Sequence, residues 1–177
     1  GIYFSVILKP DILPTEVPKI TLLAAVSVAA AIRKVANLTA LIKWPNDILI
    51  NERKVCGILT EMNAEADRIN FIVLGIGINV TTKISELPKG ATSLLEEGAR
   101  DILRVELFKK LLMELESHYI LFQKEGFATI AQEWQNLSAI LGSRVKIISH
   151  KEKIEGQAAG IDSDGALIIR LDNGFQR

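Results

Sequence analysis

The segment KWPND, from Lys43 to Asp47, combines a cation, a rigid turn and a carboxylate. Because a residue before proline is restricted in its backbone, we expect a defined turn that presents polar side chains at the end of a strand. If Asp47 faces a cleft, its carboxylate could orient or deprotonate an amine. The alternative is a polar turn that only joins two strands, and composition alone favours that alternative.

A second segment places Lys54 at the mouth of an apolar strand that continues from Val55 to Leu59. A lysine in this position could act as a compact positive charge for a carboxylate or a phosphate. The alternative is a solvated lysine at the end of a hairpin. Gly57 lies inside the same strand, and a glycine there often marks close approach by a ligand or another backbone.

The third segment, GIGIN, carries Gly75 and Gly77 at alternate positions and ends at Asn79. It differs from a dinucleotide-binding fingerprint, which needs a third glycine and a turn from strand to helix. The Asn79 amide could pair with the edge of an adenine, whereas the alternative for the glycines is a strand with steric gaps. Because the three segments lie on successive strands, they could line one cleft together.

Hydrophobic periodicity predicts the elements that position these residues. The order of elements is α+β rather than a repeating βαβ array, with a small all-β module after the last helix. We expect the strand over residues 69–80 to be central, because its run is apolar on both faces. The predicted domains cover residues 1–138 and 139–177. The predicted strands cover residues 2–8, 41–44, 47–50, 54–62, 69–80, 144–148, 154–161 and 166–171; the helices cover 18–35, 104–124 and 127–135, and a long loop covers 81–98.

Composition narrows the possible classes of function. Lysine plus arginine and aspartate plus glutamate each number 21 in 177 residues, and this balance argues against a broad nucleic-acid surface. The single cysteine, Cys56, rules out a disulfide framework and is predicted to be a buried core residue, while two distant histidines make a zinc site improbable. The longest apolar stretch, residues 22–32, is shorter than a membrane span, and no signal peptide is visible. We therefore expect a cytoplasmic protein without a membrane partner.

Taken in order, the three segments resemble the biotin–protein ligase family. Its members carry KWPND, then K-(I/L/V)-x-G-I-L-x-E, then G-x-G-(I/L)-N at similar separations, and this chain has KWPND, KVCGILTE and GIGIN. The resemblance runs from Ile2 to the end of the chain. It implies a class II synthetase-like catalytic fold, which is a mixed sheet with packing helices, followed by a small SH3-like β-barrel.

The resemblance also implies an activity. Such enzymes condense biotin with ATP to give biotinyl-5′-AMP and pyrophosphate, and then pass biotin to a lysine of a carrier protein, usually the biotin carrier subunit of acetyl-CoA carboxylase. Lys54 would contact the biotin carboxylate and the adenylate phosphate, Lys43 would add positive potential, and Asp47 would orient the acceptor lysine. Mg²⁺ would accompany ATP. The walls of the biotin and ribose pocket would be formed by Gly57, Leu59, Gly75 and Gly77. Asn79 would contact adenine, and a loop with Ala91, Thr92 and Ser93 would cover adenine.

One family feature, a Gly- and Arg-rich loop of the form GRGRxGRxW, would precede the strand with which this chain begins. Without that loop we expect weak binding of the adenylate and an inactive chain. By analogy with the family we expect a homodimer formed through the catalytic sheet, and DNA binding only if a further N-terminal domain exists.

Two alternative functions remain open. A lipoate–protein ligase would share the fold and the adenylation chemistry but would need a longer pocket, and KWPND argues against it. A non-catalytic interaction domain on the same scaffold would have no need to retain both Lys54 and Asp47.

Overall fold

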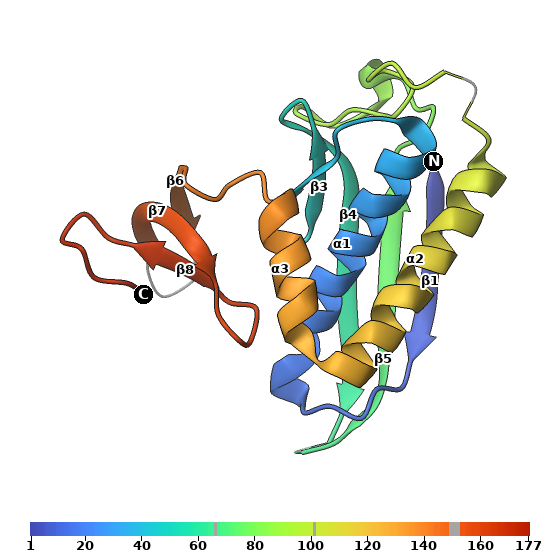
Figure 1. Cartoon of the computed structure of the whole chain (residues 1–177). Coiled ribbons are helices and arrows are strands. Elements are labelled where there is room, and N and C mark those ends of the chain that lie inside the picture. The colour runs from blue at the N-terminus through green and yellow to red at the C-terminus, as the bar shows by residue number, and fades with distance from the viewer. Residues whose placement is uncertain (66, 101, 149–152) are drawn as a thin grey trace.

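The computed structural model describes residues 1–65, 67–100, 102–148 and 153–177, and its larger part is a five-stranded sheet with helices on one face (Figure 1). The strands lie in the order β1-β5-β4-β3-β2, and all neighbours are antiparallel. This arrangement confirms the predicted α+β class. The strands are β1 (Ile2–Leu8), β2 (Leu41–Lys43), β3 (Asp47–Ile50), β4 (Arg53–Ala64) and β5 (Ile69–Ile78).

Three helices, α1 (Val17–Ala36), α2 (Arg104–Glu125) and α3 (Phe127–Leu137), cover the same face of the sheet (Figure 1). Pro18 lies in the first turn of α1, where its missing N–H leaves no helix hydrogen bond unmade. Four alanines on α1, Ala24, Ala25, Ala29 and Ala31, are fully buried, so this helix approaches its neighbours closely. The connections include two short 3₁₀ turns, η1 (Pro14–Glu16) and η2 (Ile84–Glu86).

The apolar composition of α1 exceeds what we expected from the run at residues 22–32. Within the described residues, Pro14–Ala36 is long and apolar enough, by length and composition alone, to cross a membrane. In the structure 72% of its most apolar window is buried, because the helix packs between the sheet and the other two helices. The expectation that no segment reaches this length is therefore wrong, although these side chains are engaged in the core.

Strand β5 is central in the sheet, as predicted, because it pairs with both β1 and β4. The expectation that both of its faces are buried is wrong. Ile72, Leu74, Ile76 and Ile78 are buried against the helices, whereas the residues between them are only half-buried on the opposite face. Two of the half-buried residues are glycines. Glycines do not interrupt an apolar run in the sequence, but they have no side chain to bury on the second face.

The C-terminal module is a three-stranded antiparallel sheet, β6-β7-β8, that lies beside α3 (Figure 1). Its strands are β6 (Arg144–Ile148), β7 (Lys153–Ile161) and β8 (Leu167–Arg170), with a further bridge between Arg170 and Gln176. Residues 149–152, which connect β6 to β7, lie outside the described residues. Ile161 is buried in the main core and Leu167 packs against it, so the module shares part of the larger core.

A buried carboxylate ties α1 to α2. Glu114 is 7% exposed and lies 2.7 Å from Lys34 Nζ and 2.8 Å from Lys110 Nζ. Burial raises the pKa of the Glu114 carboxyl, but its hydrogen bonds to the two lysines outweigh burial, so this pKa is lowered from its ordinary value. The Glu114 carboxylate therefore stabilises the fold at neutral pH.

This arrangement predicts an acid-sensitive contribution to stability. A lowered folded-state pKa stabilises the fold above the ordinary glutamate pKa of 4.5, and the contribution is lost as pH falls through the folded-state value. We expect Glu114→Gln to reduce the free energy of unfolding by about 2 kcal/mol near neutral pH, with the deficit shrinking in acid. Urea unfolding of both proteins between about pH 7 and pH 3 measures this. A deficit that does not change with pH would contradict the assignment.

Candidate functional site

One row of residues crosses all five strands on the sheet face opposite the helices. The strand register pairs Tyr3 with Gly77, Gly77 with Gly57, Gly57 with Asp47, and Asp47 with Lys43. Paired residues project to the same face of a sheet, so this register brings the three sequence segments together. Sequence reasoning identified four members of the row. It missed Tyr3, whose apolar neighbours along β1 gave no sign of a functional residue.

Lys54 lies on the same face as this row because of an irregularity in β4. Cys56 pairs with Ile48 and Lys54 pairs with Leu49, which leaves Val55 as an extra residue. Val55 and Cys56 are consequently both buried, although they are consecutive. Such a bulge reverses the alternation of side chains beyond it and turns Lys54 to the face of Asp47.

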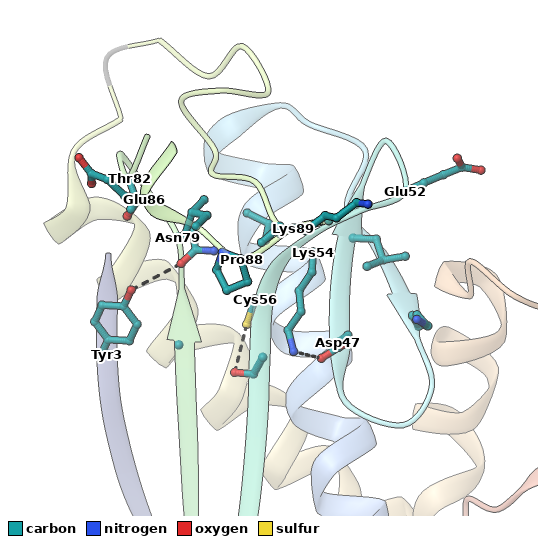
Figure 2. Close-up of a pocket in the computed structure, with 18 residues that line it drawn as sticks. Tyr3, Asp47, Glu52, Lys54, Cys56, Asn79, Thr82, Glu86, Pro88 and Lys89 are labelled. Carbon is teal, nitrogen blue, oxygen red and sulfur yellow. Dashed lines mark hydrogen bonds and ion pairs between the residues drawn. The ribbon is translucent and has the colours of Figure 1, made fainter. Parts of the chain in front are cut away.

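The central contact of the site is an ion pair. Lys54 Nζ lies 2.5 Å from Asp47 Oδ1 (Figure 2). Asp47 Oδ1 is buried and has no hydrogen bond of good geometry, so the Lys54 ammonium supplies the charge that compensates it. The Lys54 side chain is 46% exposed, which leaves its ammonium accessible to a second anion.

Gly57 and Gly77 make room for side chains of the chain itself. A Cβ at Gly57 would lie 3.2 Å from both Cε and Nζ of Lys54, so a larger residue would push the lysine away from Asp47. A Cβ at Gly77 would lie 3.1 Å from Cδ1 of Tyr3, whose ring lies against this strand. Side chains of Lys54 and Tyr3 therefore approach these two glycines closely, whereas the predicted approach by a ligand stays a prediction.

Asn79 links β5 to the loop that follows it. Its Nδ2 donates to the carbonyl of Thr92 at 3.0 Å, and its Oδ1 accepts a long hydrogen bond from Tyr3 Oη at 3.5 Å (Figure 2). The backbone of Lys54 also holds this loop, through bonds from its N–H to Gly90 and from Thr92 N–H to its carbonyl. The loop is thus fixed against both β4 and β5.

The row and the loop enclose a pocket of about 820 Å³. Thr92 and Ser93 are fully buried behind the wall, so their predicted contact with adenine stays a prediction. Three carboxylates and three lysines lie around the pocket, which gives it no strong net charge. The predicted site residues that line it are Lys43, Asp47, Lys54, Gly57, Gly77, Asn79 and Ala91.

A second hollow of about 600 Å³ adjoins the first and is lined by Leu59 and Gly75. Tyr3, Lys54 and Gly57 line both hollows, together with Gly77. Lys54 therefore stands where the two hollows meet. An ammonium at this junction could contact anionic groups of two ligands, one from each side.

Cys56 is buried beneath the first pocket, as the sequence predicted, with 1% exposure. Burial raises the pKa of the Cys56 thiol far above its usual range, so the reactive thiolate does not form near neutral pH. This excludes Cys56 as the nucleophile of the site. In the part of the chain that the structure describes, no group of three or more His, Cys, Asp or Glu residues could hold a metal ion.

Comparison with known proteins places this geometry in a family. A model of the Biotin/lipoate A/B protein ligase family matches residues 1–136. The chain belongs to this family. A second model, of the Biotin protein ligase C terminal domain, matches residues 140–177. The first model thus covers the sheet that carries the Lys54–Asp47 pair. The second model covers the module that follows α3.

Individual relatives agree with the family assignment. Bifunctional ligase/repressor BirA of Bacillus subtilis is 37% identical over 181 residues, which cover 100% of this chain and 56% of that protein. Biotin--[acetyl-CoA-carboxylase] ligase of Mycobacterium tuberculosis is 35% identical over 129 residues, 72% of this chain and 46% of that protein. The chain spans about half the length of the curated relatives it matches.

Solved structures confirm the fold. Biotin protein ligase from Aquifex aeolicus in complex with biotin and ATP superimposes with a TM-score of 0.84 at 28% identity. The match covers 99% of this chain and 73% of the Aquifex chain, so it includes both the larger sheet and the C-terminal module. The predicted α+β catalytic fold followed by a small β module is thereby confirmed.

Proposed function

We propose that this chain carries the charge-stabilising centre of a biotin–protein ligase. The complete enzyme would activate biotin with ATP and transfer biotin to a lysine of a carrier protein, such as the biotin carboxyl carrier subunit of acetyl-CoA carboxylase. The observation that carries the proposal is the position of Lys54 at the junction of two hollows, paired with Asp47. One hollow would hold biotin, beside Leu59 and Gly75, and the other would hold the nucleotide.

In the first half-reaction a carboxylate oxygen of biotin attacks the α-phosphorus of ATP. The bond from that phosphorus to the bridging oxygen breaks, and pyrophosphate leaves. Negative charge builds on the phosphoryl oxygens at the point where the two ligands meet, which is where the Lys54 ammonium stands. A fixed cation aimed at developing charge is among the strongest contributions to catalysis. Lys43, on the same row, adds positive potential nearby.

In the second half-reaction the amine of the acceptor lysine attacks the carbonyl of biotinyl-5′-AMP, and AMP leaves as the amide forms. We propose that Lys54 turns from Asp47 toward the phosphate when the adenylate is bound. The Asp47 carboxylate then becomes free to accept a hydrogen bond from the incoming amine and to take up its proton. The 2.5 Å ion pair is, in this proposal, the resting state of a group that acts in the second step.

Asn79 has two possible roles in the nucleotide site. Its amide already donates to Thr92 and supports the loop that includes Ala91 at the pocket wall. We propose that this support positions the loop over the nucleotide, while direct contact with adenine remains the role implied by the family resemblance.

Magnesium is proposed as a companion of ATP rather than a resident ion. The pocket carboxylates are Asp47, Glu52 and Glu86, and Asp47 is already paired with Lys54. These residues do not form a dedicated cage, so the phosphates would supply most of the ligands. A homodimer is proposed on the family resemblance alone, and DNA binding is proposed only for a form with a further N-terminal domain. The cytoplasmic location expected from the sequence stays a proposal.

Biotin-dependent exchange of pyrophosphate with ATP tests the proposed function. The exchange is measured on the extended form, which is this chain preceded by the Gly- and Arg-rich segment that the family carries upstream. We expect exchange with biotin and none with lipoate, because the match of residues 140–177 is to a biotin protein ligase domain. Exchange with lipoate alone would support the lipoate alternative. Binding of biotin without exchange would support a non-catalytic domain.

A further inference from the structure

The turn between β7 and β8 reaches from the C-terminal module to the KWPND segment. Trp44 Nε1 donates a hydrogen bond to the carbonyl of Gly165 at 3.1 Å. Beside it, Lys19 Nζ lies 3.3 Å from Asp164 Oδ1, and Lys19 itself is 8% exposed. A Cβ at Gly165 would lie 2.8 Å from Leu22 Cδ1, so the turn packs directly on α1. The contact therefore combines a hydrogen bond, an ion pair and close packing.

The turn is shaped internally before it makes this contact. Asp162 Oδ1 accepts hydrogen bonds from the backbone N–H groups of Asp164 and Ala166, at 2.8 and 2.9 Å. Gly165 adopts a φ of 84°, a left-handed conformation that glycine tolerates best. The Asp162 carboxylate thus sets the direction in which the Gly165 carbonyl points.

The segment that joins α3 to the module provides a second anchor on the same region. Ala139 N–H donates to the carbonyl of Ile42 at 2.8 Å, and Ser138 forms a parallel bridge with Ile42. Ile42 belongs to β2, the outermost strand of the sheet order, which has β3 on one side. The residues directly before and directly after Lys43 are therefore both held by the C-terminal part of the chain.

The anchored segment leads straight to the site. Lys43 pairs with Asp47 across the turn that contains Trp44, and Asn46 Nδ2 ties that turn to β4 by donating to the carbonyl of Ile58 at 2.7 Å. We propose that the β7–β8 turn is a positioning element for catalysis, in which Gly165 holds Trp44 and thereby sets the positions of Lys43 and Asp47. This inference rests on the proposed ligase function and assigns the C-terminal module a role in the transfer step.

Asp162→Ala tests the inference without touching the pocket, because it removes the carboxylate that shapes the turn. Asn173→Ala is the matched control: Asn173 Oδ1 accepts from Phe175 N–H in another turn of the same module. In the extended form we expect Asp162→Ala to lower kcat for biotin transfer about tenfold, with little change in the KM for biotin. Asn173→Ala should leave both values unchanged. Equal transfer rates in the two variants would overturn the inference.

A fluorescence measurement reads the contact independently of activity. The chain has two tryptophans, so Trp134→Phe leaves Trp44 as the single reporter. In this background we expect Asp162→Ala to shift the emission of Trp44 to longer wavelength and to increase its quenching by iodide, whereas Asn173→Ala should change neither. An unshifted Trp44 would overturn the inference. An unsubstituted extended form without biotin-dependent exchange would instead overturn the proposed function, and the fluorescence would still decide whether the turn holds Trp44.

Discussion

Replacing Lys54 with methionine should lower biotin-dependent pyrophosphate exchange in the extended form by about 100- to 1000-fold, the range found when one charge-stabilising group is lost. Methionine keeps much of the length of the side chain and removes its charge. The loss should appear mainly in kcat, because the ammonium meets the charge that develops during attack on the α-phosphorus. Initial rates at saturating biotin and ATP measure this effect.

Lys83→Met is the control for this prediction, because Lys83 is exposed in the loop after β5 and does not line either hollow. Its exchange rate should match that of the unsubstituted protein. If Lys54→Met retained most of its exchange activity, the ammonium at the junction would not be the charge-stabilising group.

Replacing Asp47 with asparagine should separate the two half-reactions. Without the carboxylate, the acceptor amine loses the group that orients it and takes its proton, and such groups contribute about 100-fold or more. We expect single-turnover transfer from preformed biotinyl-5′-AMP to fall by about that factor. Pyrophosphate exchange should fall only a few-fold, because Lys54 keeps its charge and loses only its ion pair with the Asp47 carboxylate.

The control for this variant is Glu61→Gln, which neutralises an exposed carboxylate further along β4. Both half-reactions should proceed normally in that protein. An equal loss of exchange and transfer in Asp47→Asn would show that Asp47 serves adenylation as well, and our assignment of its role would be wrong.

Much of the fold could be predicted from the sequence because its signals are local. The turn residues Asn51 and Glu52 separate two apolar runs, and the hairpin of β3 and β4 forms where they indicate. The regular apolar stripe of residues 104–124 likewise predicted α2 to within one residue. These elements follow from side-chain periodicity and turn chemistry, which neighbouring residues determine.

The details of the site depended on contacts between distant segments. The bulge at Val55, which turns Lys54 toward Asp47, follows from the register of β3 against β4 and has no signal in the run KVCGIL. Tyr3 is separated from its partner Asn79 by 76 positions, and Trp44 from Gly165 by 121. Sequence order identified which residues to bring together, but only the strand register shows how they meet.

Calorimetric titration of biotin, followed by ATP, into this chain and into the extended form tests the central claim most directly. We expect heat of biotin binding in the extended form and little or none in this chain, because the Gly- and Arg-rich segment would complete the pocket whose floor Gly57, Gly75 and Gly77 provide. ATP should then bind to the biotin complex. The absence of biotin binding in both forms would contradict the account.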